Sequence, residues 1–101
     1  MTRQCLMQIE GHIRDAQGII GDSVGSEHSK EHRFGRYPGA RRHYTKIKEL
    51  YDKATEFVKE AQPYYEKGPE RMDSAKFHVA LDRLMVGYAH IFQAMQLCQE
   101  K

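Results

Sequence analysis

The feature that most constrains this chain is a run of apolar side chains, three or four residues apart, in its C-terminal third. The intervals are 4, 3, 4, 3, 4 and 3 residues, at Phe77, Leu81, Leu84, Tyr88, Ile91, Met95 and Cys98. This spacing places one apolar stripe along a helix. We expect the helix to begin at Pro69, because proline suits a first helical turn, and to end near Gln99.

Two further segments have the same periodicity. One helix is expected from Thr2 to Asp22 and another from His43 to Gln62, where Pro63 should end or kink it. Three apolar stripes bury against one another, because none of them is stable in water. The sequence therefore predicts an all-α fold, a three-helix antiparallel (up-down-up) bundle. With 101 residues, the chain (1–101) has the size of a single domain.

The third expected helix is the longest, with about 30 residues against about 20 in each of the others, so part of it should project or pack on another molecule. It also carries a stripe of small residues seven apart, at Ala80, Gly87 and Ala94. Small residues let two helices approach closely, which makes the stripe a candidate homo-oligomer interface. The alternative is that the stripe packs inside the monomer.

Residues 23–42 are expected to form a long loop between the first two helices, punctuated by Gly and Pro. Positive charge is concentrated here. Residues 28–48 contain seven Lys or Arg and one acid, a net charge of +6, although the whole chain carries only +2. Such an uneven distribution indicates an anionic partner, and a long loop in a compact domain is usually functional or disordered.

Arginines and aromatic residues alternate within this basic segment. Guanidinium groups match phosphate oxygens, and the rings of Phe34 and Tyr37 would stack on unpaired bases or act as anchors. The expected contacts with nucleic acid or another polyanion are Arg33, Phe34, Arg36, Tyr37, Arg41, Arg42, Lys46 and Lys48. Two alternatives stay open: a protein partner with an acidic surface, and a solvated loop that pairs with acidic faces of its own or a neighbouring subunit.

The string His28-Ser29-Lys30-Glu31-His32 matches the H-x-x-E-H pattern of the inverted zinc peptidases. Peptidase chemistry would require two histidine ligands, the glutamate as base and a third ligand further along the chain. A domain of this size lacks the cleft of such enzymes. We expect at most adventitious transition-metal binding by His28 and His32, and no cofactor.

Arg83 and His90 lie seven residues apart on one face of the third expected helix. This spacing resembles the Arg-x(4–6)-His motif of the HEPN ribonucleases, which are helical and place the pair at a dimer interface. The resemblance implies that Arg83 binds the scissile phosphate and that His90 transfers protons. A polar residue often follows the arginine in that family, whereas Leu84 follows it here. The alternative is a surface arginine paired with an acid, and a histidine at a helix boundary.

No apolar stretch is long enough for a signal peptide or a transmembrane helix, so we expect a cytoplasmic protein without membrane contact. Cys5 and Cys98 fall at opposite ends of the expected bundle, which argues against an internal disulfide and suits a reducing compartment. The preferred function is a small, non-catalytic accessory subunit. It would assemble with itself or a larger complex through helix faces and contact nucleic-acid phosphates through the basic loop.

Overall fold

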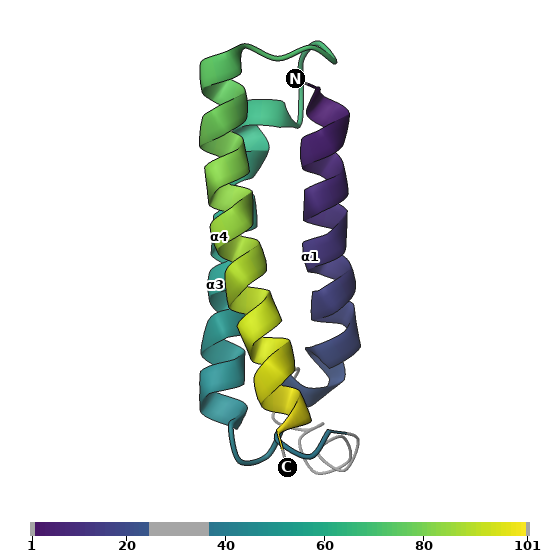
Figure 1. Ribbon diagram of the computed structural model, residues 1–101, viewed down its shortest axis with the longest axis vertical. Coiled ribbons are helices and arrows are strands. Elements are labelled where there is room, and N and C mark those ends of the chain that lie inside the picture. Colours follow the sequence, from purple (N-terminus) through teal and green to yellow (C-terminus); the bar gives the residue numbers. More distant parts are fainter. Residues whose placement is uncertain (1, 25–36, 101) are drawn as a thin grey trace.

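Three helices packed side by side form the part of the chain that the computed structural model describes, residues 2–24 and 37–100 (Figure 1). They are α1 (Arg3–Val24), α3 (Tyr44–Tyr65) and α4 (Ser74–Gln99). These described residues contain no strand. The predicted all-helical fold with three packed helices is therefore confirmed. None of the described helices combines the length and apolar composition needed to cross a membrane.

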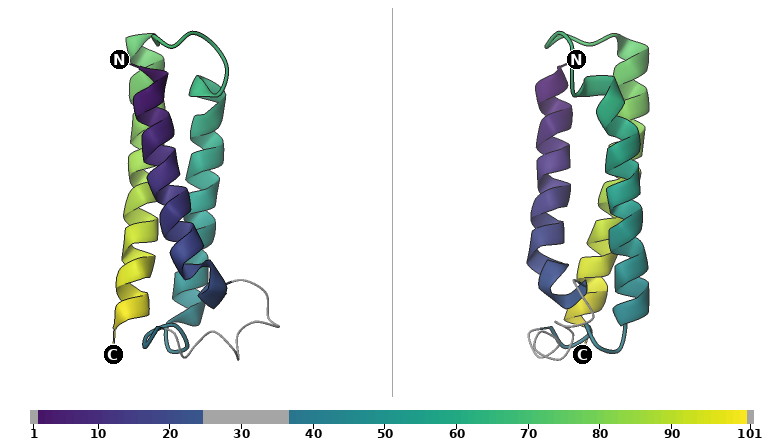
Figure 2. Two further views of the ribbon diagram at one scale, coloured as in Figure 1. Left: turned by 90° about the vertical axis from the view of Figure 1, so that its right-hand side faces the viewer. Right: turned by 180° about the vertical axis from the view of Figure 1, so that it is seen from behind.

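Backbone hydrogen bonds fix how the helix ends meet. The Arg3 N–H donates to the Glu70 carbonyl (2.9 Å), so the start of α1 lies beside the segment leading into α4. At the other end, the Gly39 N–H donates to the Cys98 carbonyl (2.9 Å), so the residues before α3 lie against the end of α4. Figure 2 shows the N-terminus near the α3–α4 connection and the C-terminus near the start of α3.

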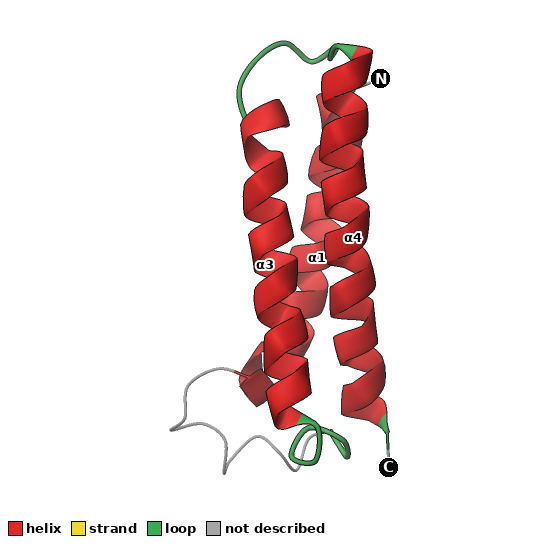
Figure 3. Ribbon diagram, turned by 90° about the vertical axis from the view of Figure 1, so that its left-hand side faces the viewer, coloured by secondary structure: helices red, strands yellow, loops and turns green. Residues whose placement is uncertain are grey.

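Each helix contributes one buried stripe to a common core, and each contacts the other two (Figure 3). The stripe on α1 consists of Leu6, Ile13 and Ile20. The stripe on α3 consists of Ile47, Leu50, Ala54, Val58, Ala61 and Tyr65. The stripe on α4 consists of Phe77, Ala80, Leu84, Gly87, Ile91, Ala94 and Cys98. Burial of these side chains supplies most of the free energy that holds the helices together.

The stripe on α4 differs from the expected one because small and large residues alternate along it. Ala80, Gly87 and Ala94 lie inside the monomer, which matches the alternative to an oligomer interface. A Cβ atom at Gly87 would lie 3.2 Å from the Phe57 Cβ and 3.5 Å from the Ala54 carbonyl oxygen, so α3 approaches α4 closely at this point. Tyr88, expected in the core, is displaced to the surface and is 40% exposed.

The predicted start of α4 at Pro69 is wrong, because the helix begins at Ser74. The Asp73 carboxylate accepts hydrogen bonds from the backbone N–H groups of Ala75 (2.9 Å) and Lys76 (3.3 Å), which makes Asp73 the N-cap. The preceding connection includes Gly68, whose φ of +122° favours glycine. With 26 residues in α4 and 22 in each of the other helices, the expected large overhang of α4 is also wrong.

The predicted end of α3 at Gln62 is also too early, since the helix passes through Pro63 and ends at Tyr65. A proline in the last turn removes only one backbone hydrogen bond, and burial of the Tyr65 side chain, which is 2% exposed, favours continuing the helix. The tertiary contact of this one side chain therefore outweighs the local effect of proline.

Hydrogen bonds connect polar side chains of α1 with those of α3. The buried Gln17 donates from Nε2 to the Thr55 Oγ1 (2.7 Å) and to the Tyr51 carbonyl (3.2 Å). The Tyr65 hydroxyl donates to the Glu10 carboxylate, which also accepts from Arg14. These contacts satisfy polar groups that burial would otherwise leave unpaired, and they fix the position of α1 against α3.

The Glu10 carboxylate and the Tyr65 hydroxyl shift each other's pKa in opposite directions. Burial alone would raise the pKa of Glu10. Hydrogen bonds from Tyr65, Arg14 and Gln62, with the charge of Arg14, outweigh burial and lower it below 4.5. Burial and the adjacent carboxylate raise the pKa of Tyr65. The pair is therefore held as a carboxylate and a neutral phenol at neutral pH.

Candidate nucleic-acid interface

The candidate contact residues fall into two groups. Arg33, Phe34 and Arg36 lie outside the described residues, as do His28 and His32 of the H-x-x-E-H string. The remaining five gather where the chain enters α3, beside the end of α4: Tyr37, Arg41, Arg42, Lys46 and Lys48. The described part of the candidate interface is thus one end of the bundle, made of residues 37–43, which we call the basic turn, and the first turns of α3.

The basic turn is docked onto the end of α4 through Gly39. Besides the Gly39–Cys98 hydrogen bond, a Cβ atom at position 39 would lie 1.9 Å from the Leu97 carbonyl oxygen and 2.9 Å from that of Glu100. Only glycine fits such an approach. Ala40 is fully buried, and the His43 N–H donates to the Gly39 carbonyl (2.9 Å). The turn therefore has a fixed conformation set by its contact with α4.

Tyr37 anchors the start of the basic turn to α1. Its hydroxyl donates to the Ile19 carbonyl (3.1 Å), and its half-buried ring packs against the core. Tyr37 was expected either to stack on bases or to anchor, and its contacts are those of an anchor. If this end binds phosphate, the contacts would therefore come from the basic side chains more than from Tyr37.

Four of the described candidate contacts are cations. Arg41 and Arg42 are exposed on the basic turn. Lys46 and Lys48 lie 3.8 Å from the Glu49 carboxylate and 3.3 Å from the Asp52 carboxylate, in ion pairs along α3. Exposed ion pairs of this kind contribute little stability, so they would oppose a competing anion only weakly.

The backbone adds to the positive potential at the start of α3. The first turn of α3 contains no acidic residue, and His43 makes no side-chain cap there. Neither an acidic residue in the first turn nor a side-chain cap therefore offsets the positive end of the helix dipole beside Arg41 and Arg42. One carboxylate lies nearby, because Glu100 Oε2 is 3.3 Å from His43 Nε2, although the geometry is not that of a hydrogen bond.

Arg83 and His90 lie on the side of α4 that faces α3. The Arg83 guanidinium is 3.4 Å from the Glu60 carboxylate and 3.3 Å from that of Asp82. His90 Nδ1 donates to the Val86 carbonyl (2.7 Å), and its ring stacks on Phe57 with centroids 5.5 Å apart. Two carboxylates therefore surround the arginine that the ribonuclease interpretation assigns to phosphate. Leu84, which follows it, is fully buried.

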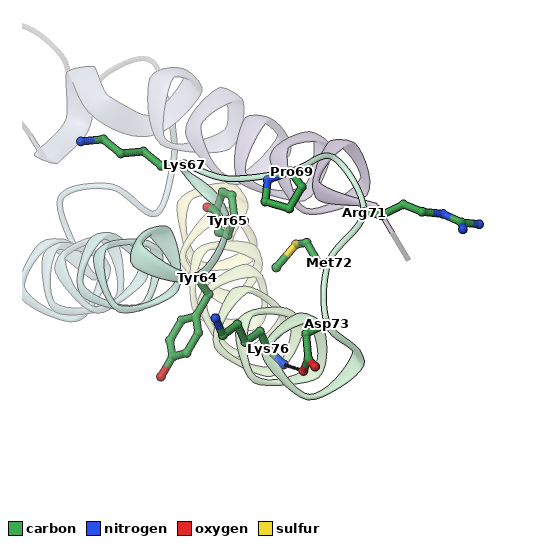
Figure 4. Close-up of a pocket in the computed structure, with 8 residues that line it drawn as sticks. All are labelled: Tyr64, Tyr65, Lys67, Pro69, Arg71, Met72, Asp73 and Lys76. Atoms are coloured by element: carbon green, nitrogen blue, oxygen red, sulfur yellow. Dashed lines mark hydrogen bonds between the residues drawn. The ribbon is translucent and has the colours of Figure 1, made fainter.

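A pocket that the sequence gave no reason to expect lies at the opposite end of the bundle, with a volume of about 200 Å³ (Figure 4). It is lined by Tyr64, Tyr65, Lys67, Pro69, Arg71, Met72, Asp73 and Lys76. Figure 4 shows Lys67 and Arg71 extending away from its centre. The Asp73 carboxylate accepts a hydrogen bond from the backbone N–H of Lys76. Its charged groups do not converge, so the pocket is not arranged to bind an anion.

Metal binding has no support in residues 2–24 and 37–100, which contain no group of three or more His, Cys, Asp or Glu side chains able to hold an ion. Comparison with known proteins adds no candidate. No family model, curated protein or solved structure matches this chain. The function is therefore inferred from the chain's own residues.

Proposed function

We propose that this protein is a small, non-catalytic accessory subunit that contacts the phosphate backbone of nucleic acid through the basic segment spanning Arg33 to Lys48. In this proposal the bundle has the up-down-up arrangement, and the long basic loop lies at the end where α4 finishes. The observation that carries the proposal is the docking of the basic turn, which holds Arg41 and Arg42 exposed next to the positive end of α3.

A docked turn favours binding because its backbone loses little conformational freedom when a ligand arrives. Arginine offers paired donors to phosphate oxygens, and Lys46 and Lys48 extend the positive charge by one further turn of α3. Contacts of this kind involve phosphates and not base edges. We therefore expect binding that is insensitive to sequence and falls steeply with salt concentration.

Fluorescence anisotropy with labelled single-stranded RNA and duplex DNA, over a series of salt concentrations, tests the proposal. The decisive variant is Arg41→Gln/Arg42→Gln, which removes two positive charges from exposed positions. The matched control is Lys67→Gln/Arg71→Gln, which removes two exposed charges at the opposite end of the bundle. Loss of two phosphate contacts should reduce the log–log salt slope by about 1.4 on RNA and about 1.8 on duplex DNA.

Binding by the wild type that weakens in the decisive variant and not in the control supports the proposal. Equal weakening in both variants would mean a response to net charge alone, and no binding at low salt would leave an acidic protein partner as the better account of the arginines. The same RNA is examined for cleavage. Cleavage that disappears in His90→Ala while the helical circular-dichroism signal is retained would favour the ribonuclease interpretation instead.

A further inference from the structure

One face of α4 has no charged side chain over four turns. Between Leu84 and Gln99 the sequence contains no Asp, Glu, Lys or Arg, although 30% of the whole chain is charged. The exposed positions in this stretch include Met85, Tyr88, Ala89, Phe92 and Gln96, which we call the uncharged face. A helix surface that remains in water normally carries charges, so this composition is typical of a surface that becomes buried.

The uncharged face exposes large apolar side chains. Met85 is 51% exposed, and Phe92 is 49% exposed with its ring stacked on that of Tyr88 at a centroid separation of 6.3 Å. The face continues across a shallow groove between α4 and α1 to Ile19, which is 49% exposed. These side chains form a mainly apolar surface, and His12 and Asp15 also line the groove.

We infer that the uncharged face binds a second copy of this chain, with the two α4 helices antiparallel. A two-fold axis passing midway between Ala89 and Phe92 places each α4 residue opposite the partner residue that lies equally far from the axis on its other side. Phe92 then packs over the partner's Ala89, and Met85 lies along the aliphatic part of the partner's Gln96. A large side chain meets a small one at the centre, as close helix packing requires.

Charge favours a second copy over a charged partner. Along α4, self-pairing of the five residues of the uncharged face brings no like charges together, and the carboxylate of Asp15 lies beside this face on α1. A strongly acidic or basic partner would leave its own charges desolvated against Phe92 and Met85. The interface is also distinct from Ala80, Gly87 and Ala94, which the core already buries. The inference does not depend on nucleic-acid binding.

Sedimentation equilibrium of the full chain, from about 1 to 500 µM, measures this association directly. The wild type should approach twice its mass of 11.8 kDa at the upper concentrations. Phe92→Glu should raise the dissociation constant by about tenfold or more, because two charges are buried across the axis. Val79→Glu is the control, since Val79 is 37% exposed on α4 but shares the side that carries Arg83 and His90.

The register has its own test. Met85→Glu and Gln96→Lys should each weaken the dimer, and the double variant should recover most of the loss, because each glutamate would face the partner's lysine. All of these positions are exposed, so far-ultraviolet circular dichroism should remain unchanged. A wild type that stays monomeric throughout, a dimer that Phe92→Glu does not weaken, or a double variant weaker than both single variants would overturn the inference.

Discussion

At the scale of single residues, Gly39 is the position on which the candidate interface most directly depends. The close approach of its α-carbon to the carbonyl groups of Leu97 and Glu100 leaves no space for a side chain. The basic turn therefore packs closely on α4 because Gly39 has no side chain, and one backbone hydrogen bond to Cys98 adds to this contact. Nothing in the local sequence distinguishes this glycine from Gly35, because the contact is made with residues about 60 positions away.

Gly39→Ala should destabilise the protein by at least about 2 kcal/mol, because the new Cβ would displace the turn from α4. Gly18→Ala provides the matched control. Gly18 is exposed within α1, with no atom within 4 Å of a Cβ added there, so alanine should stabilise the helix by about 0.5–1 kcal/mol. Urea unfolding of both variants gives the two free energies, and a neutral Gly39→Ala would contradict the docked position of the turn.

The pair of Glu10 and Tyr65 makes the stability of the bundle dependent on pH. Because folding lowers the pKa of Glu10 below 4.5, the carboxylate contributes stability that is complete above that pH and is lost as the pH falls through the folded-state value. Wild type should be more stable than Glu10→Gln near neutral pH, and the difference should shrink below about pH 4.5. Urea unfolding at several pH values measures this, and a constant difference would contradict it.

Removing the donor tests the same contact from the other side. Tyr65→Phe keeps the buried ring and removes the hydroxyl that donates to Glu10. We expect a loss of about 1.5–3 kcal/mol in the free energy of unfolding, since the acceptor is charged. The pKa of Glu10, followed by NMR, should rise toward its ordinary value in this variant.

At the scale of helices, apolar spacing predicted the three elements but not their ends. The ends depend on single interactions: the Asp73 carboxylate starts α4, and the buried Tyr65 extends α3 beyond Pro63. Spacing also could not choose between two stripes on α4 that share Phe77, Leu84, Ile91 and Cys98 and differ by one residue at the three positions between them. The close approach of α3 made that choice, because it buries Gly87 and excludes Tyr88.

Asp73→Ala should cost about 1 kcal/mol in the free energy of unfolding, because two N–H groups at the start of α4 lose their acceptor. Ser74→Ala is a suitable control, since the neighbouring hydroxyl contacts only the exposed His78. Thermal or urea unfolding compares the two variants. An equal effect in both would mean that Asp73 does not act as the cap.

At the scale of the whole molecule, the sequence predicted the helical bundle because periodic apolar burial is repeated many times along each helix. The candidate interface was predictable only as a concentration of charge. Arg41 and Arg42 could be named from composition, but the docking of the basic turn on α4 could not, since it depends on a contact between distant segments. The uncharged face was visible in the sequence as a gap in the charge pattern, although a different set of α4 residues, Ala80, Gly87 and Ala94, was named from the sequence as the candidate oligomer interface.

The burial of Cys98 turns it into a chemical reporter of how the molecule opens. Burial raises the pKa of its thiol to about 11, whereas Cys5 is exposed at the start of α1. A thiol-specific reagent at neutral pH should therefore modify Cys5 quickly and reach Cys98 only when the last turn of α4 separates from the bundle. The basic turn is hydrogen-bonded to the Cys98 carbonyl. The slow rate at which Cys98 is labelled would therefore report how often the turn detaches from α4.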